Sequence, residues 1–393
     1  MINRAFFRSV FIYFGANILN GLVPFLMLPI LTRSLTVESF GEIAIFQTFL
    51  SACLVMAGST IMSSATRKFF DREENHSLKI FIGSCIQGCL IITLLSTATL
   101  LFLKDSIETA LSVPVSYLFY AIISAFFMVL IQCRLGQWQV RNESSKYSIL
   151  QISQSLLIAI LTIYFVIYLE LDSFSRVLSQ ILICTILGFL SLYLLYRDGI
   201  LSFFNWNLPY IKECFLYGVP LIPHVLGVFL LSMFDRLIIA NNIGIDKAGI
   251  YMLAAQVATL ISLVHESLNK AYLPWLFEHL KNNDSEDLKM IVRMTYMWFL
   301  AILLFCPLFF IIGPNIIFFI AGPKYAEAGE IFGWLALGQS FGGMYAMLNS
   351  YIYFSKKTFV LSIVSIISGL LNVFMLLILI PAFGIKGAAI SFA

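Results

Sequence analysis

The chain has 393 residues, of which 60% are hydrophobic and 11% are charged, and its mean hydropathy is +0.93. A soluble globular protein carries about 25% charged residues, so this composition excludes an ordinary soluble domain. The net charge of +3 says little, because the placement of the charges matters more than their sum, and nothing in the sequence suggests a nucleic-acid partner.

Eleven apolar stretches of roughly 20 or more residues follow one another, and about 20 apolar residues suffice to cross a hydrocarbon core. In chain order they cover 10–32, 41–65, 78–103, 113–133, 147–169, 174–196, 213–240, 249–272, 290–312, 328–354 and 358–381. The longest polar break, 271–289, leaves no room for a soluble domain. We therefore expect an all-α integral membrane protein that moves a molecule across the bilayer or reacts with one inside it.

The basic residues are divided unequally when successive loops are assigned to alternate sides of the membrane. Of the 24 Lys and Arg residues, 17 lie on the side of the N-terminus and 7 on the other side. Cytoplasmic loops carry the excess of Lys and Arg in membrane proteins, whereas acidic residues contribute little. The sequence therefore predicts a cytoplasmic N-terminus.

Two segments of the chain read alike at an offset of 208 residues. RSLTVESFG at 33–41 precedes the second stretch and NNIGIDKAG at 241–249 precedes the eighth, each with an acid followed by a glycine that opens the next helix. Each half then holds six spans, an even number, so both halves enter the membrane from the same side. This pattern predicts a twelve-helix architecture of two parallel six-helix bundles, 1–200 and 201–393.

The repeat also predicts where the last helix ends. The sixth span ends near Tyr196, so its counterpart would end near position 407, beyond Ala393. GIKGAAISFA at 384–393 reads as the start of a twelfth helix, and about nine residues cover only roughly 13 Å of a core about 30 Å thick. We expect the last helix to be truncated in this chain.

Prolines interrupt the first stretch of each half. Pro24 frees the backbone carbonyl of Asn20, and Asn17 lies one turn earlier, while Pro220 and Pro223 interrupt the seventh stretch. Interrupted helices at corresponding places in two repeats point to a binding site at the repeat interface.

His224 is the deepest ionisable residue, within about 3 Å of the centre of its stretch at 1.5 Å rise per residue. A charged group at this depth costs about 2.5–3.5 kcal/mol, so its presence requires an explanation. Two interpretations stay open: a proton-coupled or sugar-binding position beside freed carbonyls, and a neutral histidine that joins helices.

Two further charged pairs lie toward the ends of their stretches. Asp235 and Arg236 lie about 13 Å outward of the centre, where they can remain at the interface or face an outward cavity that binds an anionic headgroup. Glu266 and Lys270 have i,i+4 spacing, which fits either a structural ion pair or the lining of an aqueous vestibule.

Cations and an aromatic residue gather at the end of the fourth stretch: Arg134, Trp138, Arg141 and Lys146. Such a group can receive a diphosphate at the inner leaflet, because guanidinium groups bind phosphate oxygens in pairs. The ordinary interpretation is basic anchoring with an interfacial tryptophan. The sequence does not decide between the two.

Uncharged polar residues inside the stretches can line a hydrophilic path or join helices. They are Gln87, Gln151, Gln154, Gln256, Gln339 and Asn349. The sequence contains no phosphate-binding loop, no zinc-protease motif and no nucleophile elbow. We therefore expect no catalytic residues, no cofactor, no metal and no enzymatic activity.

Three segments carry a family resemblance: RSLTVESFG at 33–41, DRLIIANNIGIDKAGIY at 235–251 and IPAFGIKGAA at 380–389. They resemble the polysaccharide transporters of the multidrug/oligosaccharidyl-lipid/polysaccharide exporter superfamily, and among these the Wzx-type O-antigen flippases. The resemblance covers the whole chain, but its short motifs identify the superfamily better than the substrate.

The resemblance implies a flippase that moves an undecaprenyl-diphosphate-linked sugar repeat unit from the cytoplasmic to the periplasmic leaflet of a bacterial inner membrane. It implies alternating access between two bundles, coupled to an ion gradient of H+ or Na+, with polysaccharide polymerase machinery as a further partner. The candidate substrate contacts are Asn17, Asn20, Arg33, Arg134, Arg141, His224, Asp235, Arg236, Gln256, Glu266 and Lys270.

Two other functions stay open. A drug or cation antiporter of the same superfamily would favour acidic groups deep in the first half, whereas the acids there, such as Glu42, lie at the ends of the stretches. A membrane glycosyltransferase or O-antigen polymerase would carry a large periplasmic loop, and the outer loops here have only about 7–15 residues. The sequence favours the flippase.

Overall fold

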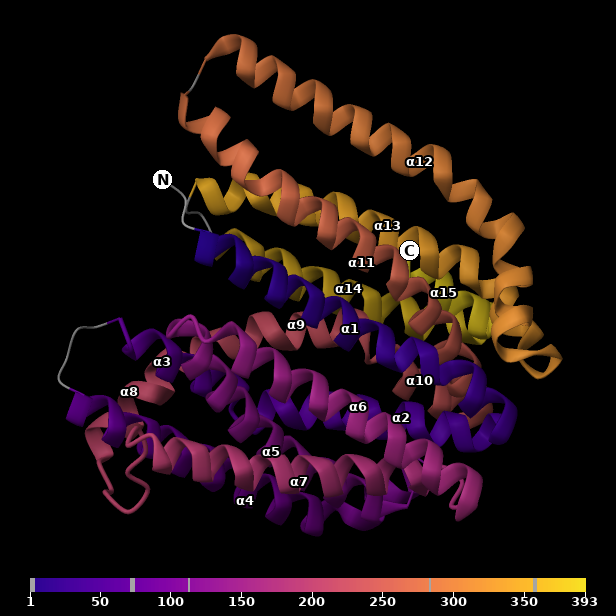
Figure 1. Cartoon of the computed structure of the whole chain (residues 1–393). Coiled ribbons are helices and arrows are strands. Elements are labelled where there is room, and N and C mark those ends of the chain that lie inside the picture. The colour runs from indigo at the N-terminus through magenta and orange to yellow at the C-terminus, as the bar shows by residue number, and fades with distance from the viewer. Residues whose placement is uncertain (1–3, 71–74, 112–113, 283, 356–358) are drawn as a thin grey trace. The chain divides into compact units, whose positions relative to one another are not determined.

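The computed structural model describes residues 4–70, 75–111, 114–282, 284–355 and 359–393. Every regular element within these ranges is a helix (Figure 1). Ten of the described segments are long and apolar enough to cross a membrane, and α13 (Ala326–Phe354) covers the other predicted stretch. The protein is therefore a multi-pass membrane protein, as its composition predicts.

Contacts within the chain divide it into two compact units, Met1–Phe229 (unit 1) and Leu230–Ala393 (unit 2). The bundles predicted from the repeat, 1–200 and 201–393, stay a prediction. In the division by contacts, α8 (Leu208–Gly218) belongs to unit 1, because it packs against α3 (Ser59–Lys68) and α4 (Asn75–Leu111).

Unit 1 is a bundle of helices packed along their lengths. The pairs α1 and α6, α2 and α5, α5 and α7, and α6 and α7 make its main contacts. Their bounds are α1 Arg4–Ser34, α2 Val37–Met56, α5 Val115–Val140, α6 Ser144–Tyr168 and α7 Phe174–Arg197.

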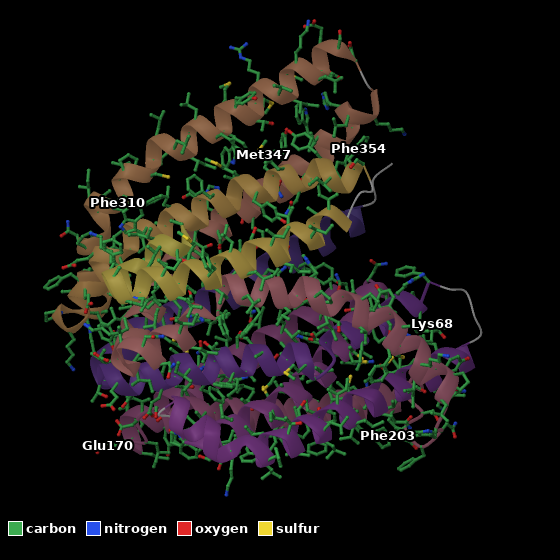
Figure 2. All side chains as sticks on the ribbon, turned by 180° about the vertical axis from the view of Figure 1, so that it is seen from behind. Lys68, Glu170, Phe203, Phe310, Met347 and Phe354 are labelled. Carbon is green, nitrogen blue, oxygen red and sulfur yellow. The ribbon has the colours of Figure 1, made fainter. Side chains whose placement is uncertain are left out.

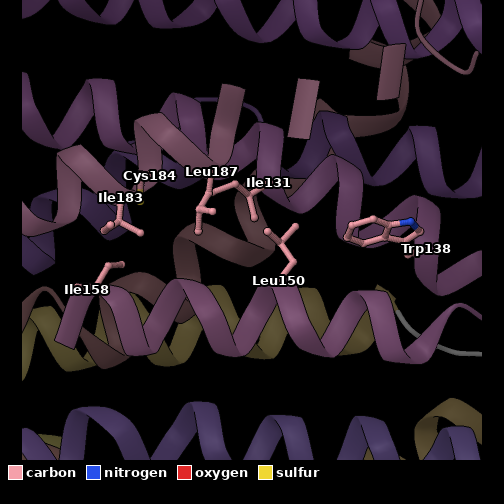
Figure 3. Close-up of a cluster of buried hydrophobic side chains, with 7 residues drawn as sticks. All are labelled: Ile131, Trp138, Leu150, Ile158, Ile183, Cys184 and Leu187. Carbon is pink, nitrogen blue, oxygen red and sulfur yellow. The ribbon is translucent and has the colours of Figure 1, made fainter. Parts of the chain in front are cut away.

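One core cluster of unit 1 joins α5, α6 and α7 (Figure 3). Ile131 of α5, Leu150 and Ile158 of α6, and Leu187 of α7 contribute apolar side chains, and Trp138 closes the cluster toward the end of α5. At Gly188 of the same α7 an added Cβ would lie 2.5 Å from the Phe127 ring. A side chain at position 188 would therefore force Phe127 of α5 to shift, and glycine lets the two helices pack without that change.

The predicted stretch 41–65 is two helices rather than one, and this prediction was wrong at its centre. Helix α2 ends at Met56 and α3 begins at Ser59, because Gly58 adopts a φ of +95°, a left-handed conformation that ends a helix. Apolar residues continue across the break, so hydropathy alone did not locate it.

The seventh stretch is also divided. Helix α8 is followed by a 3-10 turn, η1 (Val219–Leu221), then by α9 (Ile222–Ser232) and α10 (Asp235–Ile243). At Gly218 an added Cβ would lie 2.7–2.9 Å from atoms of Ile61, including its backbone nitrogen and Cα. The last residue of α8 is thus held directly against the backbone of α3.

Unit 2 is built around α13, which packs against α11 (Ile245–Asn282) and α12 (Ser285–Ala321). A 3-10 turn, η2 (Pro323–Tyr325), connects α12 to α13. Helix α14 (Phe359–Phe383) leads into α15 (Ile385–Phe392), the segment expected to start a twelfth helix, and these two pack together.

Both copies of the repeated segment connect two helices, the first joining α1 to α2 and the second joining α10 to α11. In each, the acidic residue lies in the first turn of the following helix, Glu38 in α2 and Asp246 in α11. A carboxylate in a first turn interacts favourably with the helix dipole. The Thr36 hydroxyl also accepts a hydrogen bond from the Ser39 amide, which caps α2.

Candidate functional site

Four cations gather at one end of unit 1, where α3, α5 and α7 end and α8 begins. They are Arg67 and Lys68 at the end of α3, and Arg134 and Arg141 at the end of α5; we call them the basic cluster. Lys68 marks this end of unit 1 and Glu170 marks the opposite end (Figure 2).

Lys68 connects α3 to α8. Its side chain is 7% exposed, and its Nζ donates to Oε1 of Glu213 at 3.0 Å. The same ammonium lies 5.2 Å from the centre of the Phe81 ring and 5.7 Å from that of Tyr210, so α4 and α8 both contribute an aromatic face. Ion pairing and cation–π attraction together explain how this charge is tolerated in a buried position.

Arg134 is the most deeply buried cation, with 2% of its side chain exposed. Its guanidinium donates to Oδ2 of Asp198, just beyond α7, and lies 4.2 Å from the centre of the Trp138 ring. Burial raises the pKa of Asp198, but the hydrogen bond and the charge of Arg134 lower it by more than burial raises it, so the pKa lies below its ordinary value. Arg134 therefore holds α5 to the end of α7.

Arg141 and Arg67 lie over aromatic rings. The Arg141 guanidinium is 4.9 Å from the centre of the Phe69 ring and donates to both the backbone oxygen and Oε1 of Gln137. Burial and then the charge of Arg134 lower the pKa of Arg141. Arg67 is exposed and lies 5.3 Å from the centre of the Tyr217 ring.

The arrangement divides the basic cluster into two roles. All four cations lie over aromatic rings, but Lys68 and Arg134 are also buried against the carboxylates of Glu213 and Asp198, whereas Arg67 and Arg141 are more accessible. A guanidinium positioned by an aromatic ring retains N–H groups for a phosphate oxygen, and it is preorganised for that contact. In the described part of the chain no group of three or more His, Cys, Asp or Glu side chains is arranged for a metal ion.

The predicted site residues of the first stretch lie on α1. Asn17 is exposed, and its Oδ1 accepts a hydrogen bond from Nε2 of Gln151 on α6 at 3.4 Å. Asn20 is half-buried, and Arg33 is exposed in the last turn of α1. Pro24 and Pro29 lie inside α1, which continues through both.

His224 lies in the first turn of α9, next to the 3-10 turn that contains Pro220. It is half-buried, and its Nδ1 is buried without a hydrogen-bond partner. The prolines thus coincide with a real change of helix type, and the imidazole next to it has an unsatisfied nitrogen.

Asp235 and Arg236 are buried inside unit 2, with 1% and 6% exposed, and their expected position at the membrane interface stays a prediction. Oδ1 of Asp235 accepts from the backbone N–H of Arg236 at 2.8 Å, and Nη1 of Arg236 is directed at the sulfur of Met233. These contacts lie within and just before α10, so the pair is held by its own segment of the chain.

The remaining predicted residues lie on α11. Gln256 is half-buried and its Oε1 lacks a hydrogen-bond partner, whereas Glu266 is exposed. The side chain of Lys270 lies outside the described residues, so the expected Glu266–Lys270 pair stays a prediction.

Sequence reasoning missed a second polar group on the same helix. His265, Asn269 and Tyr272 line a cavity between α11, α12 and α13. Their spacing of i, i+4 and i+7 places them on one helical face, and this periodicity would have revealed them.

Comparison with known protein families matches residues 6–280, more than half of the chain, to the family described as "Polysaccharide biosynthesis protein". The chain belongs to this family. Among its relatives are a protein of the Lsg locus of Haemophilus influenzae (26% identical, covering 97% of this chain and 95% of that one) and the capsular polysaccharide biosynthesis protein CapF of Staphylococcus aureus (26% identical, covering 96% and 93%).

Two solved structures show that this polysaccharide biosynthesis protein has a transporter fold. The lipid II flippase MurJ in an inward closed conformation has a TM-score of 0.76, covering 98% of this chain and 84% of that one at 15% identity. An inward-facing multidrug resistance MATE family transporter of the MOP superfamily has a TM-score of 0.75, covering 95% and 90%, also at 15% identity. The polysaccharide family expected from the sequence motifs is confirmed by the family match, and these two structures show the fold.

Proposed function

We propose that this protein is a flippase that moves an undecaprenyl-diphosphate-linked oligosaccharide, an O-antigen or related repeat unit, from the cytoplasmic to the periplasmic leaflet. The observation that carries the proposal is the family match, which links the chain to polysaccharide biosynthesis on a fold shared with a lipid II flippase. A multi-pass chain with this membership is expected to transport the lipid-linked sugar rather than to build it.

The basic cluster supports the proposal through its chemistry. A diphosphate carries several anionic oxygens, and guanidinium groups bind such oxygens through two parallel hydrogen bonds. Arg67 and Arg141 are the members that would contact it, while Lys68 and Arg134 would hold α3, α5 and α8 in place. The excess of Lys and Arg on the side of the N-terminus supports an orientation with this end of unit 1 at the cytoplasmic leaflet, where the substrate would be loaded.

The transport cycle we propose is alternating access between the two bundles, 1–200 and 201–393, driven by an H+ or Na+ gradient across a bacterial inner membrane. Asn17, Asn20, His224 and Gln256 are candidate contacts for the sugars. His224 is also the candidate proton carrier, because its buried Nδ1 lacks a hydrogen-bond partner. Polymerase machinery would take the unit from the periplasmic leaflet.

The proposal is tested by deleting the full-length gene in its host and restoring it in variant forms. Wild-type protein should restore surface polysaccharide, whereas Arg141→Ala combined with Arg67→Ala should leave lipid-linked units on the cytoplasmic leaflet. Lys104→Ala is the control, because Lys104 is an exposed cation of unit 1 outside the basic cluster. Units that reach the periplasmic leaflet normally in the deletion strain would refute the proposal and favour a drug or cation antiporter.

A further inference from the structure

A cavity of about 200 Å³ lies inside unit 2, between α11, α12 and α13. His265, Asn269 and Tyr272 line it from α11, Met294 and Trp298 from α12, and Met347 from α13. The ring of His265 stands perpendicular to that of Trp298, with centres 5.7 Å apart. Figure 2 shows Met347 on α13, partway between Phe310 on α12 and Phe354 at the end of α13.

Most polar groups of the lining are already engaged. The Asn269 amide donates to the backbone oxygen of Ala346 at 3.3 Å, and the Tyr272 hydroxyl lies 3.4 Å from that of Tyr351. Among the described side chains of the lining, Nδ1 of His265 is the buried polar atom that lacks a hydrogen-bond partner. A sugar ring has several hydroxyls that each need a partner once they leave water, so this cavity suits an apolar group with at most one polar contact.

The volume and lining fit a branched, unsaturated hydrocarbon. A cavity of about 150 Å³ admits benzene, so about 200 Å³ admits one five-carbon isoprene unit and part of a second. The two methionines adapt to an irregular shape, and Trp298 adds aromatic surface to the lining, which suits C–H groups and double bonds. The occupant is therefore defined by shape rather than by hydrogen bonds.

The position along the helices matches the start of a lipid chain rather than its end. The cavity is lined by the second half of α11 (Ile245–Asn282) and the first half of α12 (Ser285–Ala321), toward the polar connection between these two helices. Lys289, which pairs with Glu286 at 2.9 Å and has 74% of its side chain exposed, lies five residues before Met294 on α12, about 8 Å along the helix axis. A hydrocarbon held in the cavity thus has a cation close to where an attached anionic headgroup would lie.

We propose that this cavity binds the isoprene units of the lipid carrier that adjoin the diphosphate. The inference rests on the proposed function, since it assumes a polyprenyl-linked substrate. It assigns to unit 2 the recognition of the carrier chain, whatever sugar the carrier bears.

Photo-crosslinking of the purified full-length protein in lipid nanodiscs tests this assignment. The probe is geranyl diphosphate bearing a diazirine, and the labelled peptides are identified by mass spectrometry. Label is expected on α11, α12 and α13, and excess undecaprenyl phosphate should remove it while excess phosphatidylglycerol should not. Equal displacement by phosphatidylglycerol would overturn the proposal, because the cavity would then be a general lipid site.

Two methionines of α12 provide a matched pair of variants. Met294→Trp should fill the cavity and reduce labelling about tenfold. This is the loss of affinity expected if about two methylene groups of the probe are no longer buried. Met297→Trp is the control, because Met297 is 60% exposed and does not line the cavity. Undiminished labelling of Met294→Trp, or label confined to other helices, would overturn the assignment.

Failure of this inference can be distinguished from failure of the proposed function. If wild-type protein restores surface polysaccharide in the deletion strain but the label falls elsewhere, the flippase stands and the cavity assignment falls. If lipid-linked units cross the membrane without the protein, the flippase proposal falls and this inference falls with it.

Discussion

Asp198 is the partner of the most deeply buried arginine of the basic cluster, so neutralising it tests the energetics of the cluster. Asp198→Asn keeps the shape of the side chain and one acceptor oxygen but leaves the charge of Arg134 without its counterion. Removing one partner of a fully buried ion pair costs about 3–5 kcal/mol. The Asp198 side chain is 33% exposed, so solvent screens part of the interaction and we expect a loss of about 2 kcal/mol.

The assay is thermal unfolding of the purified protein in detergent. For a unit of this size about 2 kcal/mol corresponds to a decrease of about 4–8 °C in the unfolding temperature. Lys146→Gln is the matched control, since Lys146 pairs with Glu143 at 2.6 Å but its side chain is 60% exposed. Such a surface pair contributes about 0–1 kcal/mol, so the control should change the unfolding temperature little.

A double variant separates the ion pair from other effects of Asp198. Arg134→Met with Asp198→Asn removes the uncompensated buried charge, and an apolar replacement of a buried pair is often neutral. We expect the double variant to be more stable than Asp198→Asn alone. If Asp198→Asn is as mild as the Lys146 control, or if Arg134→Met adds a further loss, the account of the buried pair is refuted.

Three further predictions concern the same end of unit 1. Glu213→Gln should lower the unfolding temperature more than Lys68→Met. The first change removes the negative charge that pairs with a buried ammonium, whereas the second removes the positive charge that pairs with a half-exposed carboxylate. Equal losses would contradict this explanation. Gly218→Ala should lower stability by about 1–3 kcal/mol in the same assay, since its Cβ has no room against α3, whereas Gly15→Ala on α1, where a Cβ meets nothing within 4 Å, should be neutral or stabilising. The stability difference between wild type and Asp198→Asn should be fully present above about pH 4, and it should disappear as the pH falls through the lowered pKa of Asp198. Unfolding measured from about pH 7 to about pH 3 would show this loss. A difference that does not change with pH would contradict the assigned ion pair.

The fold was largely predictable from the sequence because a membrane helix leaves a local signal. About 20 apolar residues in a row reveal it without any knowledge of its neighbours. Breaks in helices were harder to predict. Pro24 lies inside a continuous α1, whereas Pro220 coincides with a 3-10 turn and Gly58 divides one apolar stretch into two helices. The same residue type therefore ends or continues a helix according to what packs around it.

The site was less predictable because its contacts are long-range. Arg134 reads as a membrane-surface anchor in the sequence, yet it is buried against Asp198, 64 residues further along the chain. Lys68 likewise pairs with Glu213 across 145 residues. No local periodicity reports such pairs, whereas the face formed by His265, Asn269 and Tyr272 has a helical spacing that the sequence does display.

The most direct test of the central claim is the leaflet position of the substrate in vesicles that contain only the purified full-length protein. Lipid-linked saccharide extracted from the deletion strain would be inserted into one leaflet, and its exposure on the other would be followed with a membrane-impermeant lectin. Transfer that requires the protein and that is slowed by Arg141→Ala combined with Arg67→Ala is the result we predict. Transfer at the rate of protein-free vesicles, with an ion gradient imposed in either direction, would contradict the account.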